Sequence, residues 1–435
     1  MNRRLRLWNK LRASFWFTPA LIVIGSMALA IALVEVDAWQ SAELARWSPR
    51  LFGAGADGSR AMLSAIATSM VTVAGVVFSI TIVSLSLTST QYSPRVLRNF
   101  MRDAPTQVVL GVFVGIFAYC LVVLRTIRGG DEGAFIPSLS VLAGMGYAFV
   151  GIAVLIYFIH HVARSIQASS ILARIADDTA TAIDHLFPQE LASAPAEGFA
   201  SLGLPDEWQP VRATRSGYLV SVDGEALMTL SRESARVLRV EYPVGAFVSE
   251  GAVVACAAGR DPLRGREADR LRACVALGSQ RTVEQDAAFG LQQLVDVALR
   301  ALSPGINDPT TACMCVDRLG ALLGRLGGRR IPEPGRSEGG QLRVIAPAPD
   351  FESLVAGALD AVVRHSRGDL QVLKSVLGAL DTIIGATDAP GRRLTLRRRL
   401  AALATEVARI RPRGQAAPLR QRIMELDRRL RDGGQ

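Results

Sequence analysis

The residues whose types and spacing could do the most specific chemistry lie in a short loop between two predicted helices. Residues 303–311 read Ser-Pro-Gly-Ile-Asn-Asp-Pro-Thr-Thr, so proline and glycine end one helix and Asp308 with Pro309 begins the next. Backbone N–H groups at a helix start, with hydroxyls and an amide beside them, could hold an anion or another polar ligand. A well-capped turn without a ligand would have the same sequence, so both interpretations stay open. The candidate ligand-binding residues are Asp286, Asp296, Arg300, Asn307, Asp308, Thr310 and Thr311.

A second chemically distinctive pattern lies in the apolar run at 62–87. Its hydroxyl side chains recur at helical spacing and, together with Gly75, form one line along the predicted helix, which we name the hydroxyl stripe. Such a stripe permits close packing between membrane helices, and it could equally line a wet pathway. An arginine at the inner mouth would favour anions over cations. The candidate pathway-lining residues are Thr68, Thr72, Ser79, Ser86, Thr90 and Arg95.

Sequence motifs of enzymes are absent. The chain has no P-loop, no Gly-x-Gly-x-x-Gly at a strand–helix turn, no His-Glu-x-x-His and no Gly-x-Ser-x-Gly. His160 and His161 are adjacent and would face different ways on a helix, while Cys313-Met-Cys315 has no histidine nearby. The three carboxylates among the candidates could act together only if the fold brought them together. We therefore predict no catalytic residues, no metal and no cofactor, and favour a non-enzymatic role.

Four apolar runs make the first part of the chain a predicted membrane domain, residues 1–162. They cover about 17–36, 62–87, 108–124 and 139–160, and no charged residue lies near the middle of any of them. Each is close to or above the roughly 20 residues that a helix needs to cross a bilayer. The hydroxyl stripe therefore belongs to the second of four transmembrane helices.

Positive charges predict the orientation of these helices. Five basic residues precede the first run, and three arginines lie between the second and third; such residues stay preferentially on the cytoplasmic side. The first run contains the cleavage-like motif Ala28-Leu29-Ala30 but continues past it, and it is too long for a signal peptide. We expect a multi-pass protein of the bacterial inner membrane with both termini in the cytoplasm.

The rest of the chain predicts a cytoplasmic α+β domain. An amphipathic helix and a Pro/Ala/Gly-rich linker occupy 163–210, and strand-like runs fill 211–260. The turn Gly245-x-x-Val-x-x-Gly251 resembles the hairpin of lipoyl and biotinyl domains, so we expect a small β-barrel-like subdomain there. Those domains attach their cofactor to a lysine, and this segment has none. A structural barrel without a covalent cofactor is therefore the prediction.

Helices are expected to return after the strands. Residues 261–326 form a helical subdomain that carries the Ser-Pro-Gly-Ile-Asn-Asp-Pro loop, 327–349 a flexible excursion, and 350–435 a basic helical region. Thirteen arginines against three acidic residues lie within 392–431. In a soluble protein this excess would suggest nucleic acid, but beneath a membrane the anionic lipid headgroups are the nearer partner. A solvated helix face explains the charge equally well.

Three segments resemble a bacterial family of predicted membrane proteins known as domain of unknown function 2254. They are Gln91-Tyr-Ser-Pro-Arg95, Arg281-Thr-Val-Glu-Gln-Asp-Ala-Ala-Phe-Gly290 and Ala301-Leu-Ser-Pro-Gly-Ile-Asn-Asp-Pro-Thr-Thr-Ala312. The order of four spans followed by a cytoplasmic domain is similar as well. The resemblance implies a membrane protein and carries no established activity.

These patterns together predict an α-helical membrane domain joined to a cytoplasmic α+β domain, in a homo-oligomer within the lipid bilayer. The favoured function is a channel-like or transport protein for a small solute or ion, with the cytoplasmic domain as regulator. The alternative is a membrane-anchored sensor, scaffold or envelope-maintenance protein without a pathway. Conduction needs polar residues around a common axis, whereas a scaffold needs the stripe buried between helices.

Overall fold

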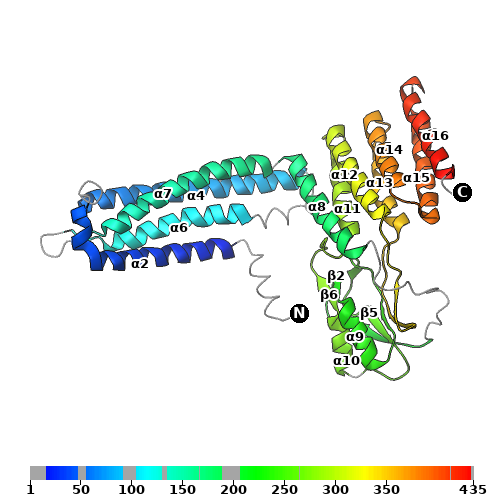
Figure 1. The fold of residues 1–435 in the computed structure, drawn as a ribbon, viewed down its shortest axis with the longest axis horizontal. Helices are drawn as coiled ribbons and strands as arrows, with labels where there is room; N and C mark the ends of the chain where they lie inside the picture. The colour runs from blue at the N-terminus through cyan, green and yellow to red at the C-terminus, as the bar shows by residue number, and fades with distance from the viewer. Residues whose placement is uncertain are drawn as a thin grey trace. The chain divides into compact units, whose positions relative to one another are not determined.

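The computed structural model describes residues 16–47, 55–91, 104–129, 135–165, 167–188, 206–263, 265–411 and 413–432. The chain divides into two compact units, Met1–Ser170 and Ile171–Gln435 (Figure 1). Each unit has a hydrophobic core of its own.

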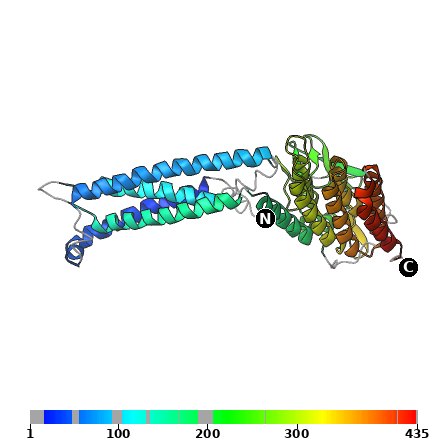
Figure 2. The same ribbon diagram turned by 90° about the horizontal axis from the view of Figure 1, so that it is seen from above.

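The described residues of the first unit form four long helices that lie side by side (Figures 1 and 2). Each contains a segment long and apolar enough to cross a membrane, which confirms the four predicted spans. The helices extend beyond the apolar runs, because their polar ends continue the helical hydrogen bonding. They are α2 (Phe17–Trp47), α4 (Ala56–Gln91), α6 (Ala104–Thr126) and α7 (Ser138–Ser165).

Helix α6 forms the centre of the first unit, since it packs against α2, α4 and α7. Two of its glycines allow the closest approach. A Cβ atom on Gly111 would lie 2.9 Å from the Cα of Pro19, and one on Gly115 would lie 2.6 Å from the Oγ of Ser26. Neither gap accommodates a side chain, so this small-xxx-small pair is a packing surface for α2.

The second unit contains a stack of helices (Figure 1). Helix α11 packs on α12 and α13, α12 packs on α14, and α15 packs on α13, α14 and α16. Aspartates start several of these helices by accepting backbone N–H groups of the first turn. The helices are α8 (Ala168–Leu186), α11 (Ala287–Ala301), α12 (Pro309–Gly327), α13 (Phe351–His365), α14 (Leu370–Gly385), α15 (Pro390–Arg409), the short 3-10 helix η2 (Arg413–Ala416) and α16 (Ala417–Asp432).

The described strands of the second unit form two open sheets. A five-stranded sheet has the order β1-β5-β3-β8-β7, antiparallel except for the parallel pair β3 and β8, and an antiparallel three-stranded sheet has the order β4-β2-β6. The elements are β1 (Trp208–Arg212), β2 (Gly217–Val222), α9 (Gly224–Ser234), β3 (Leu238–Val240), β4 (Phe247–Val248), β5 (Val253–Ala258), α10 (Gly265–Ala273), β6 (Val275–Gly278), β7 (Gly335–Glu338) and β8 (Gln341–Ile345).

The expected β-barrel-like subdomain at 211–260 is wrong, although strands lie where they were predicted. Its strands are divided between the two sheets, and the described residues form no barrel. Helix α9 separates β2 from β3, with Leu227 and Leu230 buried on one face and Asp223 as its N-cap. Strand β8, about a hundred residues further along the chain, pairs with β3 where a barrel would have had to close.

The same strands account for the segment 327–349, which the sequence suggested to be a flexible excursion. It contains the hairpin of β7 and β8, joined at Gly339 and Gly340, both of which have positive φ. Two consecutive residues with positive φ suit a tight hairpin turn and favour glycine. The Gly/Pro/Arg-rich composition therefore encodes a hairpin that completes the five-stranded sheet.

Candidate functional site

The Ser303–Thr311 loop joins the end of α11 to the start of α12 and is stabilised by its own hydrogen bonds. The carboxylate of Asp308 accepts from the backbone N of Thr311 at 3.0 Å and from its Oγ1 at 2.6 Å. These bonds hold the pKa of Asp308 below its usual value. Asn307 has a left-handed φ of 49°, and the next amide, that of Asp308, donates to the carbonyl of Ala301 at 2.8 Å.

The loop is open to solvent. Residues 304–307 and Thr310 are exposed, and the side chain of Ile306 belongs to the exposed large hydrophobic residues of the chain. The amides of Ile306 and Asn307 both donate to the carbonyl of Ser303. The geometry fits a well-capped turn that presents its side chains outward, and ligand binding here stays a prediction.

The other candidate ligand residues do not join this loop in one site. Asp286 caps the first turn of α11, whereas Arg300 lies in its last turn. The 14 residue steps from one to the other correspond to about 21 Å at 1.5 Å per step. Asp296 lies between these positions and accepts a hydrogen bond from Gln292 at 2.8 Å. Asp286 and Asp296 therefore lie at different turns of α11, whereas Asp308 caps α12, and Arg300 is the candidate of α11 nearest in the chain to the loop.

Asp286 instead belongs to a buried ion pair. Its Oδ2 accepts from Arg281 Nη2 at 2.7 Å and from Nε at 2.9 Å, while Oδ1 accepts from the backbone N of Phe289 at 3.0 Å. Only 4% of the residue is exposed. Burial raises the pKa of Asp286 above its usual value, and Arg281 opposes that shift. The arginine also stacks on the Phe289 ring, 4.8 Å from its centroid.

The sequence around this pair connects the helical part of the unit to its sheets. Gln285 accepts a hydrogen bond from the backbone N of Val222 in β2 at 2.9 Å. A Cβ on Gly245 would lie 2.3 Å from the Oδ2 of Asp286, and one on Gly290 would lie 2.2 Å from the Oγ1 of Thr179 in α8. The segment Arg281–Gly290 thus packs between the strands and the helices of the unit. These packing contacts explain why it contains these residue types.

The hydroxyl stripe lies on the side of α4 that faces away from the other three spans. Thr68, Thr72, Gly75, Ser79 and Ser86 are exposed in the first unit. The opposite side is buried in the helix bundle and comprises Leu63, Ala67, Met70, Ala74 and Val77. Of the remaining candidates, Thr90 has no described side chain and Arg95 lies outside the described residues.

Comparison with known proteins places this architecture in a family. A model described as "Predicted membrane protein (DUF2254)" matches residues 12–382. The chain belongs to the DUF2254 family. Uncharacterized proteins of Mycobacterium bovis and Mycobacterium tuberculosis are 33% identical to it over 411 residues, which cover 92% of this chain and 77% of each relative. No solved structure matches. Family membership therefore supports a multi-pass membrane protein and assigns no specific activity.

One polar site of this DUF2254 chain had no recognisable signal in the sequence. Asp37 of α2 is only 2% exposed and accepts from the backbone N of Leu139 at 3.0 Å and of Ser140 at 2.8 Å. The Ser140 hydroxyl donates to it as well, at 2.6 Å, and Tyr119 OH donates to the Ser140 carbonyl at 2.8 Å. Asp37 therefore caps the start of α7 from another helix. Its position at the end of an apolar run resembles that of an ordinary loop charge.

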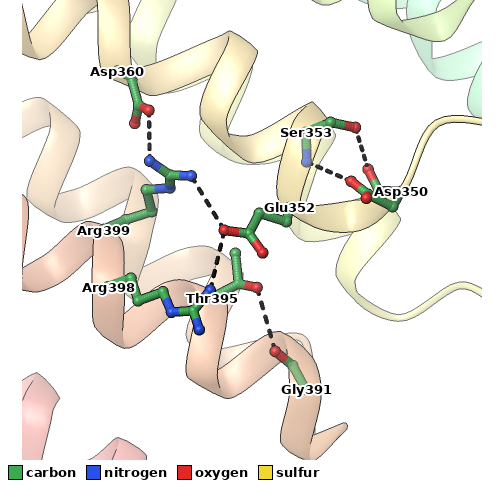
Figure 3. A network of polar contacts seen from close by, with 8 residues as sticks. All are labelled: Asp350, Glu352, Ser353, Asp360, Gly391, Thr395, Arg398 and Arg399. Carbon is green, nitrogen blue, oxygen red and sulfur yellow. Dashed lines mark hydrogen bonds and ion pairs between the residues drawn. The ribbon is translucent and has the colours of Figure 1, made fainter.

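The basic C-terminal helices α15 and α16, which follow the residues matched by the family model, use many of their arginines in ion pairs. Arg399 pairs with Asp360 at 2.5 Å and with Glu352 at 3.6 Å, which Arg398 also contacts (Figure 3). Further ion pairs join Arg397 to Asp427, Arg422 and Arg429 to Asp381, and Arg431 to Asp427. These arginines bind acidic residues of neighbouring turns or helices, so fewer of them are available for anionic lipid headgroups than the sequence suggests.

Proposed function

We propose that this DUF2254 protein is a channel-like or transport protein for a small solute or ion, with α4 lining a pathway between copies of the chain. The observation that carries the proposal is the outward-facing hydroxyl stripe. At 100° per residue, the stripe lies about 150° around α4 from the buried side chains that pack on the bundle. From Thr68 to Ser86 it rises through 18 residue steps, or about 27 Å, which approaches the thickness of the hydrocarbon core.

The interior of the described bundle supports a pathway between copies over one within a single copy. Its largest fully buried side chains are Leu63, Phe113, Ile116, Tyr119 and Phe158, which fill the centre. Large apolar and aromatic groups of this kind pack at crystalline density and would not conduct ions or polar solutes. A pathway that uses the stripe therefore needs another subunit on the exposed side of α4. The channel and the homo-oligomer are thus one proposal.

The energetics of a lipid-facing stripe also favour a partner. Within the stripe, Thr72 Oγ1 donates to the carbonyl of Thr68 at 2.8 Å. This back-bonding makes such hydroxyls tolerable in lipid. It leaves their acceptor lone pairs unused, and those lone pairs gain a partner only when water or another helix covers the stripe.

The alternative function, an anchored sensor or scaffold, is supported by Gly75. A Cβ at this position would meet nothing within 4 Å, so the helix backbone is open at the middle of the stripe. Small residues of this kind let two membrane helices approach closely without any water between them. In that arrangement the stripe is a dry dimerisation surface, and the second unit transmits or receives a signal without conduction.

Cysteine accessibility distinguishes these functions. In a chain lacking its own cysteines, single cysteines replace Thr72, Ser79 and Ser86 of the stripe, and Val71 and Ile80, which are exposed on its two sides, serve as controls. A membrane-impermeant thiol reagent applied to the oligomer in liposomes should label the three stripe positions and spare Val71→Cys and Ile80→Cys. Protection of all three stripe positions, together with no solute flux in the same liposomes, would refute the pathway and support the scaffold.

We further propose that the protein lies in the bacterial inner membrane with both termini in the cytoplasm, so that the second unit regulates the pathway from inside. The basic N-terminal tail and the arginines that follow α4 support this orientation. We also propose that anionic lipid headgroups bind those arginines of the C-terminal helices that take no part in the ion pairs described above.

A further inference from the structure

The second unit contains a cavity of about 170 Å³ between α13, α14 and α15. The apolar side chains that line it are four residues apart on α13 and on α14, so each of these two helices contributes one face. These walls are Leu359 and Val363 of α13, Val376 and Leu380 of α14, and Ala402 and Leu403 of α15. An apolar cavity of about 150 Å³ accommodates one benzene molecule, so this space suits a single ring.

Four charged residues, two acidic and two basic, also line the cavity. Asp360 is engaged by Arg399 at 2.5 Å, and Figure 3 shows this arginine reaching from α15 to both Asp360 and Glu352. Glu406 accepts from Arg409 at 2.6 Å. Both carboxylates therefore already have a cation.

Arg364 is different from the other three charged residues. It lies in the last turn of α13, is exposed, and takes part in none of the ion pairs among the described residues. A guanidinium at the rim of an apolar cavity offers two parallel N–H donors, which match the geometry of a carboxylate. The cavity thus combines a ring-sized apolar space with one uncommitted cation.

We propose that this cavity binds a small apolar monocarboxylate of single-ring size, with its ring between α13, α14 and α15 and its carboxylate on Arg364. A phosphate or other compact polyanion would leave the apolar walls wet and would lie near two carboxylates. An organic cation would find Asp360 and Glu406 already paired. The site is independent of the pathway proposed for α4 and would give the second unit a ligand of defined chemistry.

A fluorine NMR titration of the full chain in detergent tests this proposal with 4-fluorobenzoate as the probe. The wild-type chain should broaden the probe resonance with a dissociation constant on the order of 1 mM, as expected for a ligand with so few atoms. Arg364→Gln should weaken binding about tenfold, because one charge-assisted contact is lost. Ala402→Phe, at an exposed position on the cavity wall, should abolish binding by filling the space.

Two controls make the result specific. Arg428→Gln removes the same charge from an exposed position of α16 that does not line the cavity, and it should bind the probe like the wild type. The neutral probe 4-fluorobenzyl alcohol should bind at least tenfold more weakly to the wild type than the carboxylate does.

The proposal is overturned if Arg364→Gln and Ala402→Phe both leave the titration unchanged. Carboxylate recognition is overturned if Ala402→Phe abolishes probe binding while Arg364→Gln leaves it unchanged. It is also overturned if the neutral probe binds the wild type as tightly as 4-fluorobenzoate does. Thermal unfolding of each variant confirms that it is folded.

Discussion

Asp37 and Ser140 form a short polar contact between two different spans: the Ser140 hydroxyl and backbone N both donate to the same carboxylate oxygen, at 2.6 and 2.8 Å. Ser140 lies in the first turn of α7, where backbone N–H groups have no partner within their own helix. Asp37 thus supplies from α2 the cap that an N-cap residue would supply locally. This relationship fixes the end of one span to the beginning of another.

Replacement of Asp37 by alanine should therefore destabilise the first unit. Two backbone N–H groups and one hydroxyl would lose their acceptor in a buried place, which costs about 2–4 kcal/mol. Asp37→Asn should have a smaller effect, because the amide retains one acceptor oxygen. Thermal unfolding of the purified chain in detergent measures the difference. Asp57→Ala removes an exposed carboxylate from the neighbouring helix and is the matched control; equal midpoints for the Asp37→Ala and Asp57→Ala variants would contradict the cap.

The buried pair of Arg281 and Asp286 predicts a pH-dependent loss of stability. Arg281→Gln leaves the carboxylate buried without its cation, which should cost about 3 kcal/mol at neutral pH. Burial already raises the pKa of Asp286 in the folded state, and loss of Arg281 raises it further. A group whose folded pKa is above its unfolded pKa destabilises the fold as pH rises through that interval.

The Arg281→Gln variant should consequently lose less stability, relative to the wild type, near pH 4 than at pH 7. Chemical unfolding at several pH values checks this. The double variant Arg281→Gln/Asp286→Asn should recover part of the loss at pH 7, because an asparagine still caps α11 without bringing a charge. A pH-independent difference between the Arg281→Gln variant and the wild type would show that desolvation of Asp286 is not the cause.

The sequence predicted the parts of the fold that depend on local periodicity. Long apolar runs determine the spans, and Asp308 with Pro309 determines the start of α12, because each pattern acts over a few turns of one helix. The barrel prediction failed because sheet order depends on pairs far apart in the chain. Nothing local in β3 indicates that Leu238 and Arg239 lie beside Val344 and Ile345.

The candidate sites likewise divide into features that local sequence predicts and features that depend on tertiary packing. The hydroxyl stripe was recognisable from spacing, but the side of α4 that packs on the bundle was not. Whether Asp286 and Asp308 meet could not be predicted from the sequence, because both residues are caps, and a cap position says nothing about tertiary neighbours. The cavity near Arg364 was not predicted, since it is formed where three separate helix faces meet. Gly290 did carry a usable signal, a glycine inside an otherwise regular helix, which marks a close packing contact.

The contacts of Arg392 predict that its replacement by lysine destabilises the fold, because they depend on the planar geometry of the guanidinium group. It donates to the carbonyls of Gly327 and Arg329 at 2.7 Å each and stacks over Phe351 at 5.0 Å. These carbonyls lie at the end of α12, where they have no helical partner. Arg392→Lys keeps the charge but loses the planar fork and the stacking, so it should cost about 1–3 kcal/mol. Arg398→Lys, on the exposed surface of the same helix, should change the unfolding midpoint little.

Membrane orientation can be tested by reporter fusions. Fusions after residues 54, 105, 130 and 265 should report outside, inside, outside and inside, because the basic residues before α2 and after α4 stay in the cytoplasm. Paired alkaline phosphatase and fluorescent-protein reporters give opposite signals at each point. A periplasmic signal for the fusion after residue 265 would reverse the proposed orientation and place the second unit outside.

Substitutions in the Ser303–Thr311 loop should separate its structural role, which is to cap α12, from any role of its exposed side chains in function. Asp308→Ala removes the cap of α12 and should cost about 0.5–2 kcal/mol. Because Thr311 lowers the pKa of Asp308 in the folded state, this contribution is present at neutral pH and is lost as pH falls through the folded pKa. Asn307→Ala should be destabilised by its left-handed φ, whereas Asn307→Gly accepts that φ and should be at least as stable as the wild type.

Asn307→Gly therefore removes the amide without straining the backbone, and it isolates any functional role of the side chain. If the exposed loop contacts a ligand or another protein, Asn307→Gly should reduce solute flux, or should fail to restore the normal phenotype of a deletion strain. The unfolding midpoint of this variant should be unchanged. Thr311→Val is the complementary variant, since it keeps the backbone N–H to Asp308 and loses only the 2.6 Å hydroxyl contact. Normal function of the Asn307→Gly and Asp308→Ala variants, both folded, would reduce the loop to a capped turn between α11 and α12.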